Sequence, residues 1–399
     1  MRLTLPLQKT LLVTAIALGV FGTVAGQAQA AAYVQTNLVS DIPGLAIVTD
    51  PELVNPWGVS HSGTSPFWIS NQAENTTTLY MVTGPTNVSK VNINPPSGFV
   101  AIPTTASGPQ GPTGQVSNTN ASSFLVGNGG NGAFAHFIFS NLNGTISAWD
   151  TGVTAFVQAT TAGAGYSGLA VNTAQTQLYA ANDAGTGSVN VFNSSFAPIS
   201  LGANAFANPF PGLVPFNVQD IGGNVYVTYA PLGRPAQQNA APGAGGVAIF
   251  SESGILISAL INGGQLAAPW GVALAPTTFG EFGGDLLVGN FSYLHSEINA
   301  FDPTTGAFLG TIPIDVGSGN TAGGLWDLIF GNGASGGDLN TLYFADGING
   351  ETDGLFAAID AVPEPSTLAL LGAALAFVGV LRVSSRRRVS SDIPRSEVA

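Results

Sequence analysis

A short turn-and-strand motif recurs through this chain at a nearly constant spacing. It is clearest at residues 55–59, Asn-Pro-Trp-Gly-Val, and at residues 268–272, Ala-Pro-Trp-Gly-Val. Aligned on one position, the six copies are centred on Gly58, Gly114, Gly168, Asn217, Gly271 and Trp326. Successive copies are 56, 54, 49, 54 and 55 residues apart. A fixed period of about 50 residues is typical of propellers and other repeat arrays.

Each copy begins a unit that reads as strand, turn, strand, polar loop and strand, rich in β-branched and aromatic residues. No helical period competes with this pattern. We therefore expect an all-β, six-bladed β-propeller over residues 31–361. A strand at residues 33–39 has no repeat of its own and is expected to close the last blade, which removes exposed sheet edges. Tandem β-sandwich domains are the alternative, but they do not explain one motif recurring six times.

The charge balance of the repeat region excludes one class of partner. Residues 31–361 contain two basic residues, Lys90 and Arg234, against 19 acidic ones, a formal charge of −17. Phosphate backbones would be repelled, so we expect no nucleic-acid partner. The acidic surface could attract divalent cations or simply maintain solubility. The chain has no cysteine, which excludes disulfides, thiolate nucleophiles and cysteine metal sites.

Residues 1–30 have the pattern of a secretory signal peptide. Arg2 and Lys9 provide positive charge, and residues 11–24 form an apolar run. Ala28 and Ala30 provide the small residues of a cleavage site, so the mature chain is expected to begin at residue 31. A retained membrane helix is the alternative.

Amides and a carboxylate end several of the expected second strands. These candidate metal ligands are Asn71, Asn182, Asn290 and Asp346. At one rim of a propeller they could form a ring of oxygen ligands for Ca²⁺, the one cofactor that we consider. Alternatively, they start turns by bonding to their own backbone.

Other patterns are not assigned a catalytic role. The acidic loop at residues 346–353 departs from the EF-hand pattern and is expected to be a hairpin loop. Residues 127–132 spell G-x-G-x-x-G and residues 333–337 spell G-x-S-x-G, but neither precedes a helix as those motifs require. We assign no catalytic residue.

The histidines and tryptophans could serve either the packing of the fold or a functional site. A histidine-rich metal centre would need the fold to bring together His61, His136 and His295, the only histidines. A general base among these three residues is the other functional alternative. Trp57 and Trp270 head two of the repeats, and propeller packing explains them. An aromatic platform for sugar rings is the functional alternative.

The C-terminal segment resembles the PEP-CTERM sorting signal of bacteria. Three features occur in order: Pro363-Glu364-Pro365, an apolar run at residues 368–381, and Arg386-Arg387-Arg388. The resemblance implies an exosortase partner, cleavage near residues 363–365 and delivery to the cell surface or the extracellular matrix. Residues 362–388 are then a sorting signal with a transmembrane helix, which anchors the protein transiently in the inner membrane. Residues 389–399 are a short cytoplasmic tail.

The repeat region resembles an uncharacterised family of exported bacterial six-bladed propellers that often carry such a tail. The likeness rests on residues 55–58, 268–271, 284–291 and 299–306. More distantly, the units look like NHL-type and gluconolactonase-like propellers. The latter bind a metal in the channel, and no such ligand set can be assigned here.

Together these observations predict an exported, exosortase-sorted protein of the surface or extracellular matrix. We expect a non-catalytic binding or structural protein associated with exopolysaccharide or biofilm, with a polysaccharide or a surface protein as partner. The alternative is a metal-dependent lactonase or hydrolase of the propeller type.

Overall fold

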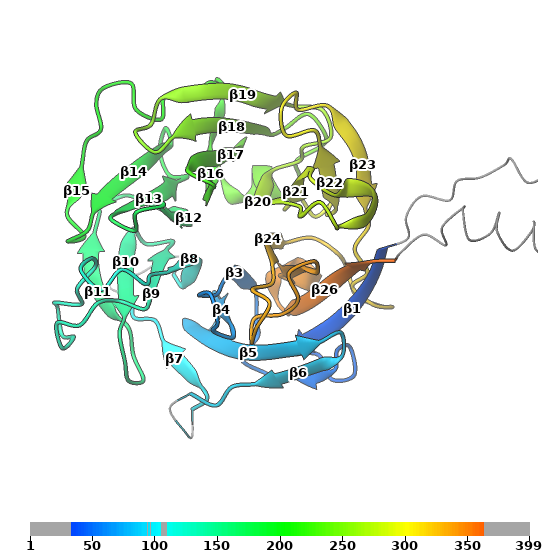
Figure 1. The fold of residues 1–399 in the computed structure, drawn as a ribbon. Helices are drawn as coiled ribbons and strands as arrows, with labels where there is room; N and C mark the ends of the chain where they lie inside the picture. The colour runs from blue at the N-terminus through cyan, green and yellow to red at the C-terminus, as the bar shows by residue number, and fades with distance from the viewer. Residues whose placement is uncertain (1–32, 94, 96, 105–109, 363–399) are drawn as a thin grey trace, which may run out of the picture. The chain divides into compact units, whose positions relative to one another are not determined.

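Six β-sheets are arranged around a central axis, and the first strand of each repeat lies nearest that axis (Figure 1). The computed structural model describes residues 33–93, 95, 97–104 and 110–362. The expected six-bladed propeller is confirmed. The proposed signal peptide and the transmembrane sorting segment lie outside the described residues. Among the described residues, no helix is long and apolar enough to cross a membrane.

Neighbouring strands within each blade are antiparallel, except for β1 and β2, which are parallel. From the channel outward, blades 1 to 3 contain β3 (Pro56–Ser60), β4 (Phe67–Asn71), β5 (Thr76–Gly84) and β6 (Asn87–Lys90), with β7 (Phe99–Ala101) also on β5; β8 (Pro112–Ser117), β9 (Phe137–Asn141), β10 (Thr145–Trp149) and β11 (Phe156–Thr160); and β12 (Tyr166–Val171), β13 (Gln177–Asn182), β14 (Ser188–Asn193) and β15 (Pro198–Ile199). Blades 4 to 6 contain β16 (Leu213–Ile221), β17 (Asn224–Pro231), β18 (Gly246–Ser251) and β19 (Leu256–Asn262); β20 (Pro269–Leu274), β21 (Leu286–Asn290), β22 (Ile298–Phe301) and β23 (Phe308–Ile312); and β24 (Leu325–Phe330), β25 (Leu342–Asp346), β26 (Leu355–Ala361), β1 (Tyr33–Ser40) and β2 (Val48–Thr49).

The N-terminal strand closes the ring, as predicted. β1 pairs antiparallel with β26 from Tyr33 opposite Ala361 to Ser40 opposite Leu355. The first and last parts of the propeller therefore share one sheet, in which the edge of β26 is covered. Helical structure in the described residues is limited to α2 (Arg234–Gln238), α3 (Ile348–Glu351) and the 3-10 turn η1 (Gly280–Phe282).

The repeated glycines are explained by how closely neighbouring inner strands approach one another. A Cβ added at Gly114 would lie 2.2 Å from the backbone nitrogen of Leu169 in the next blade. At Gly271, a Cβ would lie 2.3 Å from the carbonyl oxygen of Trp326. Only glycine fits such a contact without backbone movement.

The hydrophobic core consists of separate layers between blades. Six clusters of buried apolar side chains each combine residues from two neighbouring blades, so every blade is packed on both faces. A seventh cluster, at the centre, includes Trp57, Trp270 and Trp326. This arrangement places the innermost strands rigidly around the channel, where the two ends of those strands form different environments.

Candidate functional site

One end of the channel is filled by aromatic side chains, which we call the aromatic plug. Trp57 and Trp326 stack with ring centroids 3.5 Å apart, and Trp270 meets both rings edge-on at 6.3 and 5.6 Å. All three lie near the first residue of an inner strand and are at most 1% exposed. They are therefore propeller packing, as one interpretation predicted, and offer no open platform to a sugar ring.

A loop of blade 4, residues 231–245, contacts the plug and forms what we call the channel cap. Its helix α2 carries Arg234, whose Cζ lies 4.7 Å from the Trp57 ring centroid and 5.2 Å from that of Trp326. Gln238 donates hydrogen bonds to Tyr293 of blade 5 and Glu351 of blade 6. The cap thus ties several blades together at this end of the channel.

The opposite end contains a cavity of about 190 Å³, which we call the channel mouth. Residues near the last positions of the inner strands line it, from blades 1, 2, 3, 4 and 6. Two of the lining residues each have a buried oxygen, Ser60 Oγ and Asp220 Oδ2, that has no hydrogen-bond partner in the described part of the protein. Burial raises the pKa of Asp220 to about 6. The hydrogen bond from the Gly223 backbone lowers this pKa, and the negative charge of Glu252 raises it.

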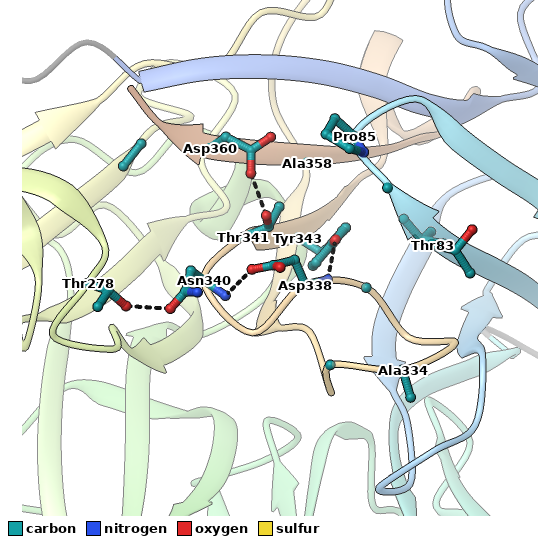
Figure 2. A pocket seen from close by; sticks show the side chains of 15 residues that line it. Thr83, Pro85, Thr278, Ala334, Asp338, Asn340, Thr341, Tyr343, Ala358 and Asp360 are labelled. Atoms are coloured by element: carbon teal, nitrogen blue, oxygen red, sulfur yellow. Dashed lines mark hydrogen bonds between the residues drawn. The ribbon is translucent and has the colours of Figure 1, made fainter. Parts of the chain in front are cut away.

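A larger cavity of about 410 Å³, the rim cavity, lies between the outer parts of blades 6 and 1 (Figure 2). It is bounded by the β5–β6 hairpin, the loop at residues 333–341 and the end of β26. The loop is held to β5 because Val82 N donates to Ser335 O and Gly337 N donates to Val82 O. The G-x-S-x-G residues therefore form a structural loop rather than a nucleophile turn.

Polar groups of the rim cavity hydrogen-bond to one another in two sets, one of Thr278, Asn340 and Asp338 and one of Thr341 and Asp360. Thr341 donates to Asp360, Thr278 donates to Asn340, and the backbone of Asn340 donates to Asp338 Oδ1 at 2.8 Å (Figure 2). Apolar groups, among them Val82, Ala334 and Ala358, complete the lining. Such a mixture of hydroxyl, amide and carboxylate groups beside apolar surface suits a ligand that presents both hydroxyl groups and C–H faces.

The four candidate metal ligands occupy equivalent positions, each at the last residue of a second strand. Asn182 Oδ1 accepts from the backbone of Gly165 and Asn290 Oδ1 accepts from the backbone of Ala267. These two amides therefore hold the loops that lead into their own inner strands. Asn71 donates to the hydroxyls of two threonines on β5.

Asp346 differs from these asparagines. Its side chain is 0% exposed, and neither carboxyl oxygen has a partner among the residues that the structure describes. Burial, with a smaller contribution from the Glu351 charge, raises the pKa of Asp346 well above its usual range. The same position in blade 2, Asn141, was missed from the sequence, although it also ends a second strand.

The histidines lie in separate parts of the fold. Both ring nitrogens of His61 face backbone carbonyls, those of Ser62 and Phe330, at 3.1 and 2.9 Å. His136 precedes β9 and packs against Phe134, and His295 lies between β21 and β22. Within the described ranges, no group of three or more His, Cys, Asp or Glu side chains is placed to hold a metal ion.

Sequence reasoning also missed Ser60 and Asp220. They are 160 positions apart, and only the closed ring places them on one cavity. A cue was available for Arg234, because a basic residue is rare in this acidic region.

Comparison with known proteins identifies the C-terminal segment of the chain. Residues 361–388 match the PEP-CTERM protein-sorting motif. The chain carries a PEP-CTERM sorting signal. This signal marks an exported substrate of an exosortase that passes through the membrane. The motif begins at Ala361, the last residue of β26, so the sorting signal follows the propeller directly.

The propeller itself is similar to uncharacterised proteins and, in fold, to solved structures that include a lyase. An uncharacterised protein of Acanthamoeba polyphaga mimivirus is 29% identical over 336 residues, covering 81% of this chain and 78% of the relative. A Bacteroides thetaiotaomicron protein of unknown function has a TM-score of 0.48 at 12% identity, over 82% of this chain and 77% of its own. A streptogramin B lyase structure has a TM-score of 0.40 at 10% identity, over 83% and 98%. We base no argument about activity on these likenesses.

Proposed function

We propose that this PEP-CTERM protein is a non-catalytic binding protein of the cell surface or extracellular matrix, and that its propeller retains a hydroxyl-rich exopolysaccharide. The sorting signal supports the location. The rim cavity supports the ligand class, since it combines Asp338, Asn340 and Asp360 with apolar surface. Its volume of about 410 Å³ lies within the range of small-ligand sites.

The rim cavity lies at the C-terminal end of the propeller. Asp360 and Ala361, the last residues of β26, belong to the cavity lining. We infer that residues 1–30 are removed as a signal peptide and that residues 362–388 anchor the protein transiently before cleavage near residues 363–365. Residues 389–399 then form a short cytoplasmic tail. Cleavage at both places leaves the β1–β26 pair, and with it the closed ring, intact.

The ligand can be found by retention on immobilised polysaccharides. The mature propeller, residues 31–361, contains all six blades and the closing strand, so it is the suitable reagent. We expect retention by at least one neutral bacterial exopolysaccharide, and elution by soluble fragments of the same polymer. Passage through the whole panel without retention would count against polysaccharide binding and favour a protein partner.

A metal-dependent lactonase or hydrolase is a second candidate, favoured by one observation. Both carboxyl oxygens of the buried Asp346 lack a hydrogen-bond partner among the described residues, and a bound cation would satisfy them. Addition of Ca²⁺ should then raise the melting temperature of the wild-type propeller but not that of Asp346→Asn. A screen of lactones and esters in the presence of Ca²⁺ completes the test. No stabilisation and no turnover would remove this candidate.

A further inference from the structure

The channel mouth is a separate cavity from the rim cavity and has unpaired polar atoms of its own. Ser60 is 6% exposed, lines the cavity, and its Oγ has no partner in the described ranges. Asp220 Oδ1 accepts from the backbone of Gly223 at 3.0 Å, which orients the carboxylate, and Oδ2 has no hydrogen-bond partner among the residues that the structure describes. A buried polar atom without a partner costs free energy, so these atoms are prepared for a ligand or for water.

The geometry of the ring sets the size of that ligand. Ser60 lies on β3 of blade 1 and Asp220 on β16 of blade 4, which are on opposite sides of a six-bladed ring. One ligand that contacts both residues must span the mouth. The cavity of about 190 Å³ corresponds to the liquid volume of about six waters, each ~30 Å³, which is the size class of a single sugar ring.

The charges around the channel favour a cationic ligand. The described residues contain only two Lys or Arg side chains. Lys90 is paired with Asp50, and Arg234 packs on Trp57 at the plugged end of the channel. Among the described residues, Asp220 and Glu252 thus have no Lys or Arg partner near the mouth, and the Glu252 charge acts on Asp220. An incoming positive charge would relieve this repulsion, and the acidic propeller would attract it.

We propose that the channel mouth binds a small hydroxylated amine of the amino-sugar class, with its ammonium group on Asp220 and its hydroxyl groups on Ser60 and Gln219. An ammonium group donates up to three hydrogen bonds and needs few ligands. Ca²⁺ instead takes six to eight oxygen ligands, and no cluster of three acidic or histidine ligands occurs in the described part of the chain. The site therefore suits an organic cation better than a metal ion.

Calorimetric titration of the mature propeller with three sugars at pH 7 tests the proposal. Glucosamine carries the amine, while glucose and N-acetylglucosamine are neutral sugars of similar shape. A hydrogen bond to a charged group contributes about 1.5–3 kcal/mol, so glucosamine should bind at least about tenfold more tightly than either neutral sugar. Equal affinities, or no binding of glucosamine, would overturn the proposal.

Two variants locate the site. Asp220→Asn keeps an acceptor for the Gly223 backbone and removes the charge, so it should reduce glucosamine affinity at least about tenfold. Ser60→Ala leaves the carboxylate in place and should weaken glucosamine binding by a few-fold. The control Asp302→Asn removes a charge from an exposed loop and should leave the affinity unchanged. If Asp302→Asn weakened binding as much as Asp220→Asn, general electrostatics rather than this site would be responsible.

These outcomes are independent of polysaccharide retention. The rim variant Asp338→Ala should not alter glucosamine binding, since Asp338 does not line the channel mouth. Melting curves of all variants identify any loss of fold. If Asp220→Asn were unfolded, Ser60→Ala with the three sugars would still decide the proposal.

Discussion

Asp327 Oδ2 accepts a hydrogen bond from the backbone N–H of Val59 at 2.7 Å, and this bond joins the inner strand of the last blade to that of the first. Asn217 makes the corresponding bond from blade 4 to the carbonyl of Trp270 in blade 5. At the other blade junctions a repeat glycine allows the inner strands to touch. The repeat therefore specifies the contacts between neighbouring inner strands. Where a blade has no glycine at this place, the side chain of Asp327 or Asn217 makes the contact through a hydrogen bond.

The Asp327 contact should make stability depend on pH. Burial raises the pKa of Asp327 to about 7, although the backbones of Val59 and Leu328 donate to it. Between about pH 4 and 7 the folded protein keeps a proton that the unfolded chain releases. The free energy of unfolding should therefore fall as pH rises through this window, by up to about 4 kcal/mol from this group.

Urea unfolding of wild type and Asp327→Asn at several pH values measures this effect. The variant cannot ionise, so the stability of wild type relative to the variant should be greatest near pH 4 and should level off above pH 7. A difference that is constant from pH 4 to 8 would show that Asp327 ionises at its usual pKa in the folded protein.

Gly114→Ala should destabilise the propeller strongly. The added methyl group would meet the backbone of Leu169 rather than a movable side chain, and overpacking costs about 1–3 kcal/mol or more. Gly63→Ala is the matched control, because nothing lies within 4 Å of a Cβ at that position. Equal melting temperatures for the two variants would refute the close contact between blades 2 and 3.

Lys90 should stabilise the seam between blades 1 and 6. Its Nζ lies 2.8 Å from Asp50 Oδ2, and Tyr80 also donates to this oxygen at 2.6 Å. Asp50 is 3% exposed, so Lys90→Met would leave a buried carboxylate with one ionic partner fewer. We expect the free energy of unfolding to fall by about 1–3 kcal/mol, toward the lower end of this range because solvent screens the partly exposed Lys90.

A double-mutant cycle with Asp50→Asn separates the pair from its surroundings. The combined variant should lose less stability than the sum of the two single losses. Additive losses would mean that the ion pair contributes nothing to closure.

Arg234 should stabilise the channel cap through its stacking on the plug. Arg234→Ala removes a cation that lies over Trp57, Phe291 and Trp326, and it should cost about 1–2 kcal/mol. Leu232→Ala, on the same loop, removes an exposed side chain and should be nearly neutral. Tryptophan fluorescence during unfolding follows both variants. Equal effects would contradict a specific role for the guanidinium group.

The sequence predicted the blade number, the order of the inner three strands and the closing strand because these depend on local pattern and on the repeat. It missed the outermost strands of the blades, such as β15 at Pro198–Ile199 and β19 at Leu256–Asn262. β15 is only two residues long, and the first residues of β19 are exposed, so neither shows the apolar alternation of a buried strand.

Candidate sites were harder to predict because they combine distant residues. The asparagines that end second strands were noticed, yet Asn182 and Asn290 hold their own loops. Ser60 and Asp220 gain meaning only from the cavity that they share. Cavities depend on how blades meet, which single-sequence pattern does not encode.

Polysaccharide retention by wild type and two matched variants tests the central proposal most directly. Asp338 lines the rim cavity and its Oδ1 accepts from the Asn340 backbone, whereas Asp302 Oδ1 accepts from Thr304 and Thr305 in a loop outside the cavity. Each alanine variant therefore loses a similar carboxylate, one that accepts hydrogen bonds from the backbone of its own turn. We predict that wild type and Asp302→Ala are retained on the polysaccharide identified in the panel and that Asp338→Ala elutes early. Equal retention of all three proteins would contradict ligand binding in the rim cavity.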